Sequence, residues 1–315
     1  MNVITRLDIP ARRVSRWVCD RLAYEHPRRA AITGLYSRVA NLRLDSGELV
    51  CMGAMEIPLS PNGLSIDLPR GLELFDLGLR TGQSATCVSD ALSIPEARLL
   101  VRLTGATRWE PRPTTAGVSP WELASRAREA RALAIAEGAS GSLLPLLWAH
   151  EGVVELPEPA RRAALPAITL GRGAIAGDRR AVERAAGRLA GLGPGLTPSG
   201  DDYLAGFAAA WALTPEALGL DSGQSRYVLD ALCSGAESGA SEVGRAWISH
   251  AARGEVAEPM ARFFTALLGT RPDALAVSAR GVLRLGATSG ADWMVGALAG
   301  VGAALAAIQV DRLWN

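Results

Sequence analysis

The spacing of apolar residues changes once along the chain, and this change constrains the fold more than any other feature. From Ile32 to about Arg108, apolar and polar residues alternate in short runs, as in residues 64–68 (Leu-Ser-Ile-Asp-Leu). Such alternation is typical of strands that bury one face. From residue 113 onward, apolar residues follow a helical spacing between glycine and proline interruptions. The sequence therefore predicts an α+β fold, with strands first and helices second.

Turn-forming residues separate the predicted strands. Residues 45–47 (Asp-Ser-Gly) and 61–63 (Pro-Asn-Gly) are typical of turns that connect neighbouring strands. The arginine-rich residues 1–30 are interpreted as helical. We predict that residues 1–112 form an N-terminal β-rich domain, an antiparallel β barrel or sandwich.

Helix-start signals mark the second part of the chain. Prolines concentrate in residues 109–120, which indicates a linker. A capping box over residues 119–122 (Ser-Pro-Trp-Glu) predicts a helix that ends near residue 137. An aspartate predicts the start of another helix over residues 178–189. We therefore predict a mostly α-helical domain over residues 113–315.

The charge balance excludes several classes of function. The chain has 33 basic and 32 acidic residues, for a formal net charge of +1. A nearly neutral chain does not favour binding to nucleic acid or to an anionic membrane by bulk charge. All the basic residues other than histidine are arginines. The absence of lysine excludes Schiff-base chemistry and every other lysine-dependent cofactor attachment.

Cysteines and histidines are few and isolated. The cysteines are Cys19, Cys51, Cys87 and Cys233, and no C-x-x-C pair occurs. This pattern favours free thiols in a reducing compartment over a thiolate zinc site. The histidines are His26, His150 and His250. Any of them could be catalytic, although an isolated histidine is more often structural.

Membrane and export signals are weak in this sequence. No apolar segment of a signal peptide follows the N-terminal arginines. The charge-free segment Trp293 to Ile308 is short for a membrane span of about 20 residues and consists mostly of alanine and glycine. We interpret it as a helix packed on all sides, and we expect a cytoplasmic protein without a membrane partner.

The most informative motif is residues 191–206, Gly-Leu-Gly-Pro-Gly-Leu-Thr-Pro-Ser-Gly-Asp-Asp-Tyr-Leu-Ala-Gly. Glycines let backbone N–H groups approach a ligand closely, and a helix N-terminus adds unpaired donors. Hydroxyl groups add further donors, so the motif suits a phosphate, carboxylate or carbonyl oxygen. The predicted substrate-binding residues of this segment are Gly193, Gly195, Thr197, Ser199 and Gly200.

Two adjacent carboxylates in the same motif require a different partner. Asp201 and Asp202 do not suit an anion by themselves. They suit an N–H group of a substrate, or a divalent metal ion that bridges to the anion. We predict that Asp201 and Asp202 are catalytic, and we assign no metal ligand.

A second segment repeats the pattern S-G-x-D-aromatic-apolar-x-G. Residues 199–206 carry the first copy and residues 289–296 carry the second. Their last positions, Gly206 and Gly296, permit close approach of two helices. We infer that the two helices pack together and that their N-termini converge on one pocket. The predicted substrate-binding residues of the second copy are Thr288, Ser289, Gly290 and Asp292.

A purely structural interpretation also fits the repeat. The S-x-x-D spacing is a variant of the capping box, in which the serine and the acid satisfy backbone groups only. This alternative is as strong as ligand binding for the second copy. It is weaker for the first copy, because capping does not explain four further glycines and a second aspartate.

Another polar segment lies at near-helical spacing. Arg245, His250 and Arg253 could bind an anionic substrate through charge-assisted hydrogen bonds. The alternative, a helix face exposed to solvent, is favoured because charged residues on helices usually face water.

Three segments resemble one bacterial family. Residues 191–202, 248–254 and 286–292 are similar to blocks of the AllH-like subunit of oxamate carbamoyltransferase, formerly listed as a domain of unknown function. The resemblance implies a role in allantoin-type nitrogen catabolism, where a carbamoyl group passes between oxalurate and phosphate. The products are oxamate and carbamoyl phosphate. It also implies partner subunits, and it marks the glycine-rich motif as the site without assigning residue roles.

The chain departs from the better-known carbamoyltransferases. The Ser-Thr-Arg-Thr loop that binds carbamoyl phosphate in the aspartate and ornithine enzymes is absent. Carbamoyl transfer here would therefore use a different site. Two alternatives stay open beside a carbamoyltransferase subunit: a non-catalytic subunit that binds a small anion or a partner, and a hydrolase of ureido acids that needs no phosphate.

Overall fold

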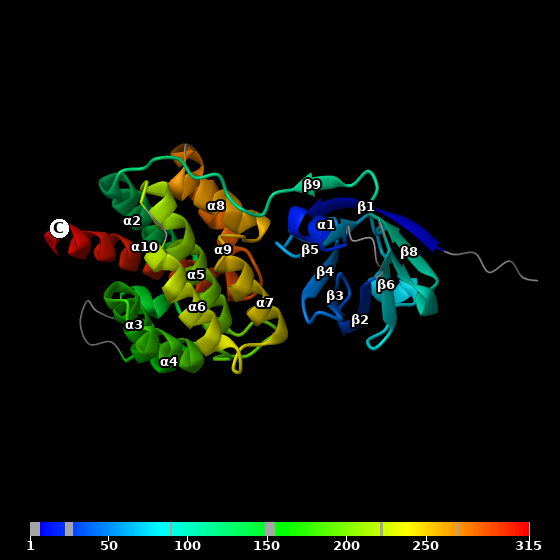
Figure 1. Ribbon diagram of the computed structural model, residues 1–315, viewed down its shortest axis with the longest axis horizontal. Helices are drawn as coiled ribbons and strands as arrows, with labels where there is room; N and C mark the ends of the chain where they lie inside the picture. The colour runs from blue at the N-terminus through cyan, green and yellow to red at the C-terminus, as the bar shows by residue number, and fades with distance from the viewer. Residues whose placement is uncertain are drawn as a thin grey trace, which may run out of the picture. The chain divides into compact units, whose positions relative to one another are not determined.

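The computed structural model describes residues 7–22, 28–88, 90–148, 155–220, 223–269 and 271–314. The chain divides into two compact units, Met1–Pro111 and Arg112–Asn315, which appear in Figure 1 as a strand-rich and a helical part. His26 and His150 lie outside the described residues, so the structure says nothing about their roles.

The first unit is a closed β barrel with one added strand. Its strands are β1 (Leu7–Ser15), β2 (Arg28–Leu35), β3 (Val39–Leu44), β4 (Leu49–Ala54), β5 (Gly63–Ile66), β6 (Ser84–Val88), β7 (Ala91–Ile94), β8 (Leu99–Arg102) and β9 (Thr107–Trp109). The strand order is β5-β4-β3-β2-β6-β7-β8-β1-β9, and the pairing of β1 with β5 closes the barrel. Closure leaves none of the eight barrel strands with an unpaired edge.

Alternating side chains fill the barrel, as the sequence predicts. In β3, Ala40, Leu42 and Leu44 are buried while Arg43 is exposed. The short helix α1 (Arg16–Leu22) and the 3-10 turns η1 (Leu74–Leu77) and η2 (Pro95–Ala97) complete this unit. Burial of these apolar faces is the main source of the stability of the barrel.

The strands of the barrel do not all pair antiparallel, as the predicted antiparallel barrel would require. Strands β2, β3 and β4 pair antiparallel, as do β6, β7 and β8. Strand β1 instead pairs parallel to β8 and β9, and β4 pairs parallel to β5. Turn residues encode the hairpins, but the place where β1 enters the barrel is set by long-range pairing.

The prediction that residues 1–30 are helical is wrong. Within this range the structure describes β1, the short α1 and the start of β2. Ile9 and Ala11 are buried and Arg12 is exposed, which is the alternation of a strand. Arginine fits the outer face of a strand as well as that of a helix, so the arginine content could not decide between them.

The second unit consists of helices. They are α2 (Pro120–Glu137), α3 (Ala160–Ala176), α4 (Arg179–Leu189), α5 (Ser199–Ala217), α6 (Gly223–Ala236), α7 (Glu242–Ala251), α8 (Glu258–Leu268), α9 (Leu275–Leu283) and α10 (Ser289–Trp314), with the 3-10 turns η3 (Leu144–Leu147) and η4 (Pro272–Ala274). The predicted starts of α2 and α4 are confirmed, because Ser119 forms a capping box with Glu122 and Asp178 accepts the Ala181 N–H. The α+β prediction, a barrel followed by helices, is confirmed.

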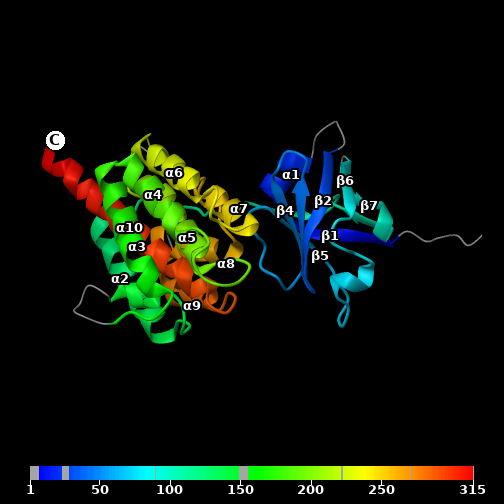
Figure 2. The ribbon, with the colours of Figure 1, turned by 90° about the horizontal axis from the view of Figure 1, so that it is seen from below.

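Helices α5 and α10 form the centre of the helical unit, where they lie against each other (Figures 1 and 2). The window Ser289–Ile308 of α10 is long and apolar enough to cross a membrane. However, 67% of this window is buried inside the unit. This burial is what the interpretation as a packed core helix predicts.

Candidate functional site

The two copies of the sequence repeat lie face to face on α5 and α10. A Cβ atom at Gly206 would overlap the carbonyl oxygen of Trp293, and one at Gly296 would overlap that of Tyr203. Tyr203 and Trp293 are equivalent positions of the repeat. The contact is therefore reciprocal, and the predicted close approach of the two helices is confirmed. Any larger residue at either glycine would push the helices apart.

The helix starts are shaped alike as well. A Cβ atom at Gly200 would overlap the carbonyl oxygen of Leu189, and one at Gly290 would overlap that of Val282. In both cases the glycine lets the end of the preceding helix pass next to the start of the following one. The glycine in each copy of the repeat therefore determines the path of the chain from the preceding helix into α5 or α10.

The two starts meet through their hydroxyl groups, so the predicted convergence of the two N-termini is confirmed, whereas the shared pocket remains a prediction. The Oγ1 of Thr197 and the Oγ of Ser289 share a hydrogen bond of 3.1 Å. Ser289 and Thr197 also hydrogen-bond to the carboxylate of Asp202. In the reverse direction, Ser199 of the first copy hydrogen-bonds to Asp292 of the second. Each aspartate thus has a hydrogen bond with a serine of the other helix.

Asp202 and Asp292 form a buried carboxyl pair. Their exposed fractions are 1% and 0%. Burial raises the pKa of Asp202 well above its ordinary value, and the negative charge of Asp292 raises it further. Burial likewise raises the pKa of Asp292, against the hydrogen bond from the Leu143 N–H. The pair therefore favours carrying a proton at a pH where an exposed aspartate is ionised.

Each carboxyl group keeps one oxygen without a partner. The N–H of Leu143 donates to Oδ1 of Asp292 at 2.6 Å. Within the described residues, Oδ2 of Asp202 and Oδ2 of Asp292 are buried and accept no hydrogen bond. A buried polar atom without a partner costs free energy, so such atoms are typical of sites that bind a ligand or share a proton. Leu143 acts through its backbone, so its side-chain identity carried no signal of this role.

The surface next to the carboxyl pair supplies hydrogen-bond donors. Thr197 and Ser289 are half-buried, whereas Gly195 and Leu196 are exposed. Gly193 and Gly195 have φ values of 105° and 104°, a left-handed region that favours glycine. Within the described residues, no hydrogen bond uses the N–H groups of residues 195–197. This loop therefore presents free donors that suit an anionic oxygen.

Asp201 is placed differently from Asp202. Its Oδ1 accepts the Gly191 N–H at 2.7 Å, and its Oδ2 accepts the Ser241 N–H at 2.9 Å. Neighbouring residues on a helix point about 100° apart, so the two aspartates face different surroundings. Asp201 connects the glycine-rich loop to the start of α7, which is a structural task. Its predicted catalytic role remains a prediction.

The pair suggested for a divalent metal does not form. Asp202 faces Asp292, while both oxygens of Asp201 face backbone N–H groups. Over the described ranges, no group of three or more histidine, cysteine, aspartate or glutamate side chains is arranged to hold a metal ion. The chemistry that this arrangement supports directly is proton transfer and binding of N–H groups.

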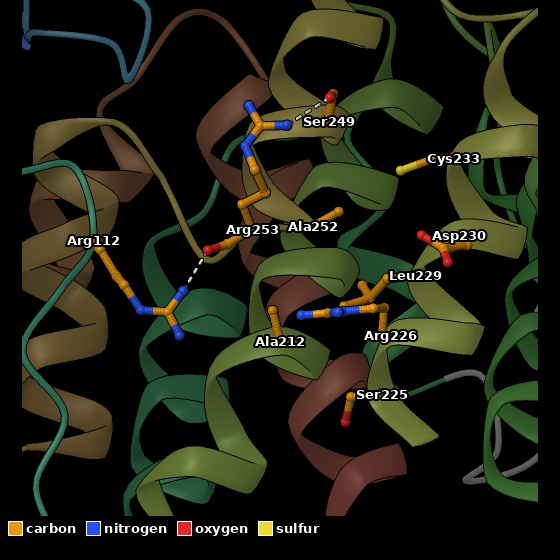
Figure 3. A pocket seen from close by; sticks show the side chains of 10 residues that line it. All are labelled: Arg112, Ala212, Ser225, Arg226, Leu229, Asp230, Cys233, Ser249, Ala252 and Arg253. Carbon is orange, nitrogen blue, oxygen red and sulfur yellow. Dashed lines mark hydrogen bonds between the residues drawn. The ribbon is translucent and has the colours of Figure 1, made fainter. Parts of the chain in front are cut away.

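A cavity lies elsewhere in the helical unit, away from the carboxyl pair. Its volume is about 510 Å³, and its lining comes from the beginning of the unit and from α5, α6 and the end of α7 (Figure 3). Arg253, one of the three polar residues predicted on the α7 segment, lines this cavity. Arg245 does not line it and instead donates to the carbonyl oxygens of Glu237 and Ala240, in the segment between α6 and α7.

The favoured interpretation of this segment as a solvent-exposed face is wrong for His250. The histidine is 3% exposed, and its Nδ1 lies 2.6 Å from Oε2 of Glu255. Its partners Glu255 and Arg253 follow it in the chain beyond the end of α7, so the helical spacing of the segment does not reveal them. His250 thus contacts the turn after α7 through its ring and its carbonyl oxygen.

Comparison with known protein families matches both units. Residues 10–108 match the AllH family N-terminal domain, and residues 189–301 match the oxamate carbamoyltransferase subunit AllH. No curated protein and no solved structure matches the chain. The second match contains both helix starts and the carboxyl pair. The chain therefore belongs to the AllH family, which is described as a subunit of oxamate carbamoyltransferase.

Proposed function

We propose that the chain is the carbamoyltransferase subunit that binds the small ureido acid oxalurate at the starts of α5 and α10. The product oxamate would occupy the same site. The observation that carries this proposal is the reciprocal pair Asp202 and Asp292 beneath the Thr197–Ser289 hydroxyl contact. A ureido group presents N–H donors on one side and a carbonyl oxygen on the other. Carboxyl oxygens without a partner and nearby hydroxyl groups are complementary to these two sides.

The reaction requires a proton on the leaving nitrogen. An oxygen of phosphate attacks the carbamoyl carbon, the bond from that carbon to the oxamate nitrogen breaks, and this nitrogen takes up a proton. In our proposal the proton comes from the Asp202–Asp292 pair, whose raised pKa values favour a bound proton at a pH where an exposed aspartate is ionised. The pair recovers the proton from hydrogen phosphate, so charge and atoms balance.

The anionic oxygens of the substrate need donors of fixed geometry. The hydroxyl groups of Thr197 and Ser289 and the free N–H groups of residues 195–197 lie at the partly exposed side of the site. In our proposal the free N–H groups hold the substrate carboxylate and the carbamoyl oxygen as negative charge develops on it, while the two hydroxyl groups position Asp202. Donors that are positioned before the reaction stabilise a transition state without reorganising.

The proposal is tested by phosphate-dependent cleavage of oxalurate with all subunits present. We expect Asp202→Asn to lower turnover about 100-fold or more, because it removes the proton donor without changing the shape of the side chain. The matched control is Asp273→Asn, which removes an exposed carboxylate in the 3-10 turn η4. Turnover of the control should equal that of the wild type.

Three other outcomes would contradict the proposal. Unchanged turnover of folded Asp202→Asn would show that the carboxyl pair takes no part in the chemistry. Wild-type product formation without phosphate would identify a ureido-acid hydrolase. If oxalurate binds to the chain and Asp202→Asn does not change the turnover of the assembled enzyme, the chain is a non-catalytic subunit.

A further inference from the structure

We infer that the cavity between α5, α6 and the end of α7 is a second binding site, and that its ligand is a small organic anion. We call it the arginine cavity. Three arginines from separate parts of the sequence line it, namely Arg112, Arg226 and Arg253. The volume of about 510 Å³ lies in the range of ligand sites, roughly 300–1,000 Å³.

The positions of the arginines are built into the fold. Arg112 and Arg226 point inward from opposite sides in Figure 3. Gly254 has a φ of 74°, and a Cβ atom there would come within 2.6 Å of Nη1 of Arg112. Nη1 of Arg112 also donates to the carbonyl oxygen of Arg253. The glycine thus leaves the space that the Arg112 guanidinium occupies.

Two of the arginines are held by carboxylates outside the cavity lining. Arg112 pairs with Glu216, and Arg253 pairs with Glu255 and donates to Oγ of Ser249 at 3.0 Å. A guanidinium has five N–H donors, so each of them keeps donors for a ligand. Within the described residues, no hydrogen bond or ion pair engages Arg226.

The charges limit the class of ligand. Asp230 also lines the cavity, and Glu216 and Glu255 neutralise part of the arginine charge. The cavity therefore offers directional donors rather than a large positive field, which favours a singly or doubly charged small molecule over a polyanion. Ala212 and Leu229 form apolar wall, so the ligand has a short carbon skeleton that carries a carboxylate or phosphate group.

Cysteine chemistry is not part of this site. Burial raises the pKa of Cys233, another lining residue, to about 11. The thiol therefore stays protonated near neutral pH and is a poor nucleophile. The cavity is a place for binding through arginine donors.

The arginine cavity is separate from the carboxyl pair. Ala212 follows Asp202 by ten positions on α5, which corresponds to about 15 Å along a helix. It also lies on the side of α5 that faces α6 and α7, whereas Asp202 faces α10. One small molecule cannot occupy both sites, so the inference does not depend on the proposed reaction.

Calorimetric titration of the full-length chain tests the inference with two probes, succinate and inorganic phosphate. We expect at least one probe to bind, and Arg226→Gln to weaken its binding about tenfold or more through loss of a charge-assisted hydrogen bond. Gly254→Ala, which displaces Arg112, should weaken it similarly. The control Arg180→Gln removes an exposed arginine of α4 and should bind like the wild type.

The comparison of probes identifies the anionic group, since succinate reports on carboxylates and phosphate on phosphate groups. Succinamide has nearly the shape of succinate without its charge, and we expect it not to bind. The inference is overturned if neither probe binds, if succinamide binds as tightly as succinate, or if Arg226→Gln binds as tightly as Arg180→Gln.

Discussion

At the scale of single residues, two adjacent aspartates have different tasks. Asp201 accepts two backbone N–H groups and connects the glycine-rich loop to α7. Asp202 is buried next to Asp292 and keeps one oxygen unpaired. Sequence adjacency suggested that the two would act together, but the geometry of a helix turns them to different sides. The carboxyl partner of Asp202 is Asp292, which belongs to the other copy of the repeat.

This arrangement predicts an unusual dependence of stability on pH. Asp202 has a higher pKa in the folded chain than its ordinary value of 3.8, so the folded state binds more protons than the unfolded state between these two values. The stability contributed by Asp202 is therefore present below about pH 4 and is lost as the pH rises through the folded pKa. Asp202→Asn removes this loss.

Thermal unfolding of the two chains between pH 4 and pH 8 measures the effect. We expect Asp202→Asn to have the higher Tm at pH 8, and the difference to shrink toward pH 4. A difference in Tm that does not change with pH would mean that Asp202 is not protonated preferentially in the folded state.

At the scale of helices, glycines determine how closely α5 and α10 approach. Gly206 and Gly296 each face a carbonyl oxygen of the opposite helix. The hydroxyl contact between Thr197 and Ser289 depends on this approach, because Ser289 begins α10 and Thr197 lies two residues before α5 begins. The packing of α5 on α10 thus positions the groups of the candidate site.

Alanine substitutions separate this packing role from helix propensity. Gly296→Ala should lower the free energy of unfolding by about 1–3 kcal/mol or more, because its methyl group overlaps the Tyr203 carbonyl oxygen. Gly302→Ala is the matched control on the same helix, since a Cβ atom at Gly302 has nothing within 4 Å. It should raise stability by up to about 1 kcal/mol. Equal effects of the two substitutions in denaturant unfolding would contradict the packing account.

At the scale of the whole molecule, the sequence predicted most of what local patterns encode. The alternation of residues 32–108 predicted the strands, and caps at Ser119 and Asp178 predicted two helices. The repeated motif predicted that α5 and α10 meet. Local patterns do not encode long-range pairing, so the parallel pairing of β1 with β8 and β9 could not be predicted. Of the three arginines that line the arginine cavity, the sequence indicated only Arg253, because no local sequence pattern marks Arg112 or Arg226.

The central claim is that two distant helix starts form one site through Asp202 and Asp292. The most direct measurement is phosphate-dependent oxalurate turnover by the assembled enzyme with Asp202→Asn, with Asp292→Asn and with both substitutions. Groups that act as a unit show strongly non-additive losses. We predict that each single variant loses most of the activity and that the double variant is no slower than the slower single variant. Losses that multiply, or wild-type turnover of either folded single variant, would contradict the claim.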